Sequence, residues 1–166
     1  MGYNFKELIV GIKSGKYKLL GVGSSRKVYD LNDGYVIKVA KDVRGIYQNQ
    51  AENKIYLLRK SNFFAQVVAV SEDSRCLIMP KANKIKSIDT VCKYYNVRSF
   101  KSLTMLDHFN DDINDNNLSR NDLIRPSSWG FIDDVPIIID YGLTHSIFKK
   151  YYGPNLIFKR YRALQY

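Results

Sequence analysis

The sequence predicts an α+β fold in which an antiparallel sheet is followed by a mostly helical half. Three strand-like runs rich in β-branched and aromatic residues lie close together near the start, and the pair Asp33-Gly34 between the second and third is a strong hairpin signal. After Ala82, apolar residues recur every three or four positions instead, which is the spacing of helices. We therefore expect the main sheet in the first half of the chain.

The first half is expected to contain two helices and five strands. The second helix follows the third strand and should place Ala51, Ile55 and Leu58 on one apolar face. The last two strands are joined by a polar turn at residues 72–74. In chain order, the expected elements are a helix at 3–14, strands at 17–23, 26–31 and 34–40, a helix at 45–60, and strands at 64–71 and 75–82.

The second half is expected to contain two helices and one small hairpin. The helices span residues 87–96 and 99–113, and each begins with a serine that can serve as its N-cap. The hairpin strands are expected at residues 128–133 and 135–142, and a basic, aromatic segment ends the chain.

Composition narrows the classes of partner. The 166 residues carry a net charge of +10, which favours an anionic partner such as a nucleotide, a nucleic acid or an acidic protein. No apolar run approaches the roughly 20 residues of a membrane span, so no membrane partner is expected. Cys76 and Cys92 form no C-x-x-C pair, and the two histidines are isolated, which argues against zinc. We interpret both cysteines as core residues in a reducing compartment, the cytoplasm.

Residues 20–42 combine a turn containing two glycines with a lysine on the strand after next. Glycine N–H groups and serine hydroxyls at such a turn can bind phosphate oxygens, although a G-x-G between strands is also common in tight turns. Lys38 lies among valines and isoleucines, where a charge needs a partner unless it faces solvent. Glu52 is the only acid in the following helix and is therefore the expected partner.

Two aspartates in the second half complete the candidate site. Asp140 follows an apolar run and precedes Tyr141-Gly142, so its carboxylate should emerge at the end of a buried strand. An acid in that position needs a cation, unless it only caps the turn. Asp122 lies in the polar segment before the hairpin.

These residues, in this order, resemble the protein-kinase fold. Gly21, Gly23 and Val28 match the glycine-rich loop, Lys38 matches the lysine of the third strand, and residues 140–142 stand where that family has D-F-G. The stretch 122–144 also resembles small kinase-like proteins carried by bacteriophages. The resemblance implies two lobes: residues 1–83 with the sheet, and a reduced, mostly helical second lobe at 84–166.

The resemblance also implies a minimal phosphotransferase that uses Mg²⁺ and ATP and acts on a hydroxyl acceptor, expected to be a protein. Its catalytic residues would be Lys38, Glu52 and Asp122, and its metal ligands would be Asp140 and Ser128. The residues implied for ATP binding are Gly21, Val22, Gly23, Ser24, Ser25, Val28, Lys38 and Met79.

The chain departs from the family pattern at several places. Arg26 replaces the third glycine of the loop. Ser127 or Ser128, depending on the alignment, replaces the asparagine that follows the catalytic aspartate. No long activation segment or A-P-E motif follows Gly142. A pseudokinase that binds nucleotide or a protein partner without turnover is therefore an alternative. A further alternative is a binder of nucleic acid or acidic protein that uses the basic, aromatic residues 148–162.

Overall fold

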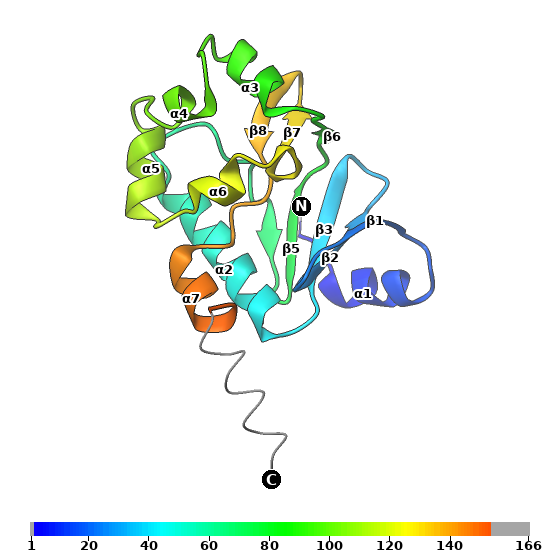
Figure 1. Ribbon diagram of the computed structural model, residues 1–166. Helices are drawn as coiled ribbons and strands as arrows, with labels where there is room; N and C mark the ends of the chain where they lie inside the picture. The colour runs from blue at the N-terminus through cyan, green and yellow to red at the C-terminus, as the bar shows by residue number, and fades with distance from the viewer. Residues whose placement is uncertain (1, 154–166) are drawn as a thin grey trace, which may run out of the picture.

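The computed structural model describes residues 2–153 and has an α+β fold (Figure 1). Its larger sheet has five strands in the order β1-β2-β3-β5-β4, and every neighbouring pair is antiparallel. The prediction of a five-stranded antiparallel sheet is confirmed. The strands are β1 (Lys18–Val22), β2 (Arg26–Asp30), β3 (Tyr35–Ala40), β4 (Ala69–Val70) and β5 (Cys76–Pro80).

Two helices, α1 (Phe5–Lys13) and α2 (Val43–Leu58), pack on opposite faces of this sheet. Side chains alternate between the two faces along a strand. Ile37 of β3 belongs to the apolar cluster that contacts α1, whereas Val36 belongs to the cluster that contains Ile55 of α2. Lys38 lies two residues after Val36 and therefore faces α2, away from α1.

The face that α2 turns toward the sheet is mostly polar. Its buried residues are Gly45, Gln48, Asn49, Glu52 and Ile55. The predicted apolar face is wrong at Leu58, which is 63% exposed, while Ile55 is buried as expected. The reason lies in the sheet opposite, where two basic side chains require polar and acidic partners on the helix.

A second, three-stranded antiparallel sheet lies in the helical half. It has the order β6-β7-β8, and the predicted hairpin is its β7–β8 pair. The third strand, β6, was not predicted because it has only two residues, both polar. The elements of this half are β6 (Asn83–Lys84), α3 (Ile88–Tyr94), α4 (Phe100–Leu103), α5 (Phe109–Asp115), α6 (Arg120–Leu123), a 3-10 turn (Pro126–Ser128), β7 (Trp129–Ile132), β8 (Val135–Ile138) and α7 (His145–Tyr151).

The helix expected at residues 99–113 is two helices. The chain leaves helical geometry between α4 and α5, and His108 has a positive φ of 60°, which no α-helix continues. The serine N-caps are confirmed, since the hydroxyls of Ser87 and Ser99 accept from the amides of Asp89 and Ser102. The spacing of apolar residues along the chain gave no sign of this break between α4 and α5.

The strand expected at residues 64–71 is also shorter than predicted. Only Ala69–Val70 pairs with β5. The preceding residues turn into the core and contact the small sheet instead, because the amide of Ala65 donates to the carbonyl of Ile138 at 2.8 Å. This contact ties the segment before β4 to the last residue of β8.

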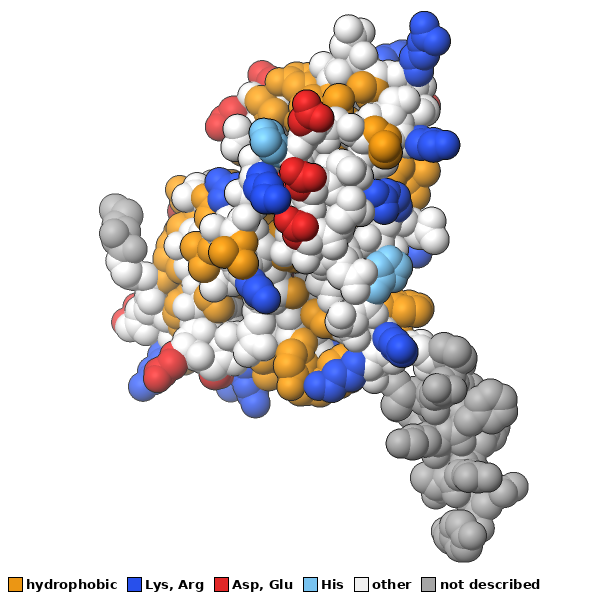
Figure 2. Space-filling model, turned by 90° about the vertical axis from the view of Figure 1, so that its left-hand side faces the viewer, with side chains coloured by type: hydrophobic (Ala, Val, Ile, Leu, Met, Phe, Trp, Pro, Cys, Tyr) orange, Lys and Arg blue, Asp and Glu red, His pale blue; other side chains and the backbone are white. Residues whose placement is uncertain are grey.

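One apolar cluster runs through both halves. It includes Leu77 and Met79 of the large sheet and Trp129 and Ile138 of the small one. Cys76 and Cys92 are free and buried, as expected. Within residues 2–153, no helix combines the length and apolar character needed to cross a membrane. The face shown in Figure 2 carries both acidic and basic side chains.

Candidate functional site

Strand register brings the basic residues of β2 and β3 to one place. Val28 lies opposite Lys38 in the β2–β3 ladder, so both side chains point to the α2 side of the sheet. Arg26 is two residues from Val28 and shares that face. Both Arg26 and Lys38 are buried, so each charge needs a partner within the protein.

The predicted partner of Lys38 is confirmed. Its ammonium group lies 2.8 Å and 2.9 Å from the two carboxylate oxygens of Glu52, which is fully buried. The ammonium also donates to the backbone carbonyl of Ile139 at 2.6 Å. An ammonium has three N–H donors, and these three contacts use all of them.

Arg26 is a site residue that the sequence reasoning missed. Its guanidinium makes a bidentate contact with Glu52, with N–O distances of 2.7 Å and 3.0 Å. The same group donates to Asn49 Oδ1 at 3.2 Å and to Asp140 Oδ1 at 2.6 Å. The only signal in the sequence was that an arginine stood where the resemblance expects glycine. Its burial depends on contacts far along the chain.

The protonation states follow from burial and charge. Burial alone would raise the pKa of Glu52, but Arg26 and Lys38 lower it to about 2. Burial would lower the pKa of Arg26, but Glu52 and then Asp140 raise it instead. The pKa of Lys38 is lowered, first by burial and also by repulsion from Arg26. Glu52 is therefore ionised at neutral pH, and Arg26 is the more firmly charged of the two cations.

Asp140 lies just beyond β8, and its side chain is 57% exposed, as expected for an acid at a strand end. Its expected cation partner was Mg²⁺, but the structure places the guanidinium of Arg26 there. Within residues 2–153, no three His, Cys, Asp or Glu side chains are grouped so as to hold a metal. A divalent cation about 5 Å from a guanidinium would be repelled by about 7 kcal/mol at an effective dielectric constant of about 20. These residues do not fit a tight magnesium site.

Ser128, the other predicted metal ligand, connects the two aspartates. Its hydroxyl donates to the carbonyl of Asp122 at 2.8 Å, and its own carbonyl accepts from the amide of Asp140 at 3.3 Å. The side chain is buried, whereas that of Ser127 is exposed. Whether Ser128 also binds a metal stays a prediction. Its hydrogen bonds make it the residue that positions Asp122 and Asp140 relative to each other.

The turn at Gly21–Ser25 is open where its glycines lie and closed where its serines lie. An added Cβ would meet no atom within 4 Å at Gly21, and neither Gly21 nor Gly23 has a positive φ. By contrast, the hydroxyl of Ser25 donates to Gln48 Oε1 at 2.8 Å, and that of Ser24 lies 3.2 Å from the hydroxyl of Tyr152. In this arrangement the backbone of the turn, rather than the serine hydroxyls, is left to meet a ligand.

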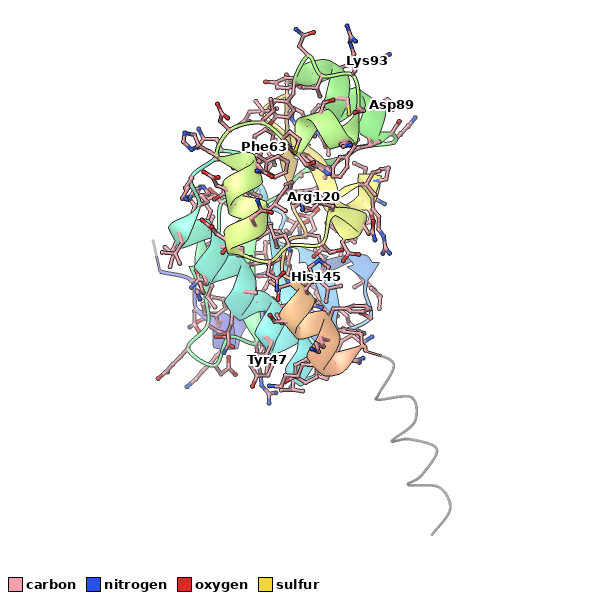
Figure 3. All side chains as sticks on the ribbon, turned by 60° about the vertical axis from the view of Figure 1, so that its left-hand side comes forward. Tyr47, Phe63, Asp89, Lys93, Arg120 and His145 are labelled. Carbon is pink, nitrogen blue, oxygen red and sulfur yellow. The ribbon has the colours of Figure 1, made fainter. Side chains whose placement is uncertain are left out.

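The C-terminal helix α7 secures this end of the site. Tyr47 of α2, labelled in Figure 3, lies with its ring centroid 5.4 Å from that of Tyr151. The guanidinium of Arg44 lies 5.2 Å from the ring centroid of Tyr152. Figure 1 shows the segment between β8 and α7 running beside α2, which keeps Asp140 close to Glu52.

A pocket of about 490 Å³ lies over these groups, within the usual range for small-molecule sites. Its charged lining residues are Arg26, Lys38, Lys84, Asp122, Arg125 and Asp140. Its apolar lining comes from both halves of the chain and includes Leu20, Val28, Val36, Met79, Leu123 and Ile139. All of the predicted catalytic residues line it except Glu52, which lies behind Lys38 and Arg26; every predicted ATP-binding residue lines it too.

No protein-family model matches this chain, and no curated protein matches it. The residues of the pocket are therefore the basis for proposing a function.

Proposed function

We propose that the chain is a minimal kinase-like phosphotransferase with ATP as its phosphate donor. The five-stranded sheet with α1 and α2 would form its first lobe, and the helical half its second. The expected boundary at residue 83 coincides with β6, where the chain leaves the large sheet and pairs with β7. The observation that carries the proposal is one pocket that collects Lys38, Asp122, Asp140 and the Gly21–Ser25 turn from distant parts of the chain.

The pocket offers different chemistry at its two ends. Apolar side chains such as Val28, Met79 and Leu123 suit the flat faces of a purine. The open space beside Gly21 lets phosphate oxygens approach the backbone of the turn, in which the amide of Gly23 already donates to the carbonyl of Arg26 at 2.8 Å. Lys38, held by Glu52, supplies positive charge beneath the phosphates, and it would exchange its bond to Ile139 for a phosphate oxygen.

Transfer itself would depend on Asp122. Its carboxylate would take the proton of an acceptor hydroxyl, whose oxygen would then bond to the γ-phosphorus. The bond from that phosphorus to the bridging oxygen breaks, and ADP leaves with the bonding electron pair. Asp122 is partly exposed, with its side chain 25% accessible, so an acceptor can reach it.

The decisive experiment combines ATP affinity with radiolabel transfer from the γ-phosphate to protein substrates in a lysate. Asp122→Asn should lose transfer while it keeps the nucleotide affinity of wild type, because Asp122 acts on the acceptor and not on the phosphates. Asp107→Asn, an exposed substitution outside the pocket, is the control. Full transfer by Asp122→Asn would remove Asp122 from this role, and failure of wild type to bind ATP would overturn the proposal.

A second candidate, nucleotide binding without turnover, is favoured by one specific observation. All three N–H donors of Lys38 and one oxygen of Asp140 are used within the protein. ATP binding with no transfer to any acceptor would decide for this candidate. The further alternative, a nucleic-acid or acidic-protein binder, relies mainly on residues 154–162, which lie outside the described part of the chain.

A further inference from the structure

We propose that Arg26 supplies the positive charge at the phosphate end of the pocket, so that the chain binds ATP without a divalent cation. This inference rests on the proposed nucleotide binding and adds the source of charge neutralisation to it. The main observation behind it is the contact between Arg26 Nη2, which is buried, and Asp140 Oδ1, on a side chain that is partly exposed, at 2.6 Å; both residues line the pocket.

Arg26 is fixed in place by three acceptors. Glu52 binds it through both carboxylate oxygens, Asn49 binds it through its amide oxygen, and Asp140 completes the set. Its side chain is 7% exposed. A guanidinium held bidentately by one carboxylate keeps a defined orientation, so its contact with Asp140 is part of the folded structure rather than an incidental surface pair.

The charge balance beneath the pocket depends on Arg26. Arg26 and Lys38 carry two positive charges, and Glu52 and Asp140 carry two negative charges, so the network is neutral. Without Arg26, the remaining three groups would carry one net negative charge next to the phosphates of ATP. Arg26 cancels that charge, and two further basic residues of the pocket lining, Lys84 and Arg125, add positive charge for the phosphates.

Arg26 also opposes metal binding at the same carboxylate. Asp140 Oδ1 is occupied by the guanidinium, and a metal on the other oxygen would lie close to a positive charge that cannot move away. A divalent cation would therefore compete with Arg26 for Asp140. Arg26 and a metal are alternative ways to neutralise this aspartate, and the structure contains the first.

The test is calorimetry of ATP binding to the full chain, with Mg²⁺ present or with excess EDTA. Wild type should bind ATP in both, with dissociation constants that differ by less than about threefold. Binding only with Mg²⁺ would overturn the role of Arg26 and leave the proposed nucleotide site standing. Absence of binding in both conditions would overturn the nucleotide site, and with it this inference.

Three variants sharpen the result. Arg26→Gln should bind ATP at least about tenfold more weakly in EDTA than in Mg²⁺, because the site then needs the metal. Arg75→Gln removes an exposed arginine outside the pocket and should behave as wild type.

Arg26→Gln leaves buried acids less well paired and can fail to fold, so Asp140→Asn provides an independent test. Asp140→Asn should keep or improve ATP affinity in EDTA. Loss of affinity in Asp140→Asn only when Mg²⁺ is present would assign Asp140 to a metal and contradict the proposal.

Discussion

Glu52 is the residue on which the buried charges of this protein converge. Its carboxylate accepts from Arg26 and Lys38, and Oε1 also accepts from the amide of Tyr141 at 3.2 Å. These contacts connect β2, β3, α2 and the segment after β8 through one side chain. Because a buried carboxylate with two cation partners strongly favours its ionised form, its protonation should weaken the whole assembly.

The first prediction concerns acid stability. The pKa of Glu52 is about 2 in the folded chain, below its ordinary value of 4.5. The stabilisation from its ionised form is therefore complete above about pH 4.5 and is lost as the pH falls toward about 2, by about 3 kcal/mol in total. Urea unfolding between about pH 6 and about pH 3 measures this loss.

The matched variants for this experiment are Lys38→Met and Lys27→Met. Lys38→Met removes one of the two cations and should reduce the acid-dependent loss, because the pKa of Glu52 then rises toward its ordinary value. Lys27 is exposed on the opposite face of β2, so its loss should leave the pH dependence unchanged. Equal pH dependence in all three proteins would show that Glu52 does not titrate as described.

The second prediction concerns Ser128. Ser128→Ala removes the hydrogen bond to the carbonyl of Asp122 and should lower the free energy of unfolding by about 1 kcal/mol. It should also weaken ATP binding, since the backbone of Asp122 loses its hydrogen bond to Ser128 and its carboxylate is then less firmly positioned. Ser146→Ala removes an exposed hydroxyl of α7 outside the pocket and should alter neither property. Thermal unfolding and calorimetry of the two variants would separate a positioning serine from a surface one.

At the scale of elements, the site depends on how closely α2 approaches its neighbours. A Cβ on Gly45 would lie 2.4 Å from the carbonyl oxygen of Ser25, and one on Gly142 would lie 2.5 Å from that of Gln48. Backbone on both sides leaves no flexible side chain to move aside. These two glycines let α2 contact the turn before β2 and the segment after β8 at once, which brings Glu52 between Arg26 and Asp140.

The third prediction compares two glycine substitutions. Gly142→Ala forces backbone apart and should destabilise the fold by about 1–3 kcal/mol. Gly21→Ala meets open space and requires no change of φ, so it should leave stability unchanged and weaken ATP binding, because its methyl group would occupy space beside the phosphates. Chemical denaturation and calorimetry on both variants give the comparison. Unchanged ATP affinity in Gly21→Ala would mean that the ligand does not approach this turn.

Local signals predicted the elements well where neighbours in sequence decide the structure. The strands at residues 18–40 follow from alternation and from the Asp33-Gly34 turn, and Lys38 with Glu52 follows from a buried charge with only one acid nearby. Which face of α2 is buried could not be predicted from the sequence, because polar contacts with the sheet stabilise an orientation that leaves Leu58 exposed. The role of Arg26 did not follow either, since its contact with Asp140 spans 114 residues of sequence.

At the scale of the whole molecule, the two halves share their core. Val36 and Met79 of the large sheet belong to the same apolar cluster as Phe109 and Trp129 of the helical half. The buried ion network also joins both halves through the contact between Arg26 and Asp140. The first half has a smaller apolar cluster of its own around Ile37, but its larger cluster is shared with the helical half. Because both packing and charge cross the boundary, the halves should not unfold separately.

The fourth prediction is therefore a single unfolding transition, which probes placed in the two halves should detect at the same urea concentration. Trp129 is the only tryptophan and is buried in the small sheet, so its fluorescence follows the helical half. Cys76 is buried in β5, where burial raises the pKa of its thiol to about 11, so it should react with a thiol reagent only after the large sheet opens. In the Cys92→Ala variant Cys76 is the only thiol, and both probes should give the same urea midpoint.

ATP extends this test to the proposed site. A ligand at about one hundred times its dissociation constant adds about 2.7 kcal/mol of stability, and because the pocket is lined by both halves, both probes should move to higher urea by the same amount. Two separate midpoints without ATP would show that the shared core does not couple the halves. A shift of the Cys76 midpoint alone would place the nucleotide on the large sheet without the helical half, and Asp122 and Asp140 would then lie outside the site that ATP stabilises.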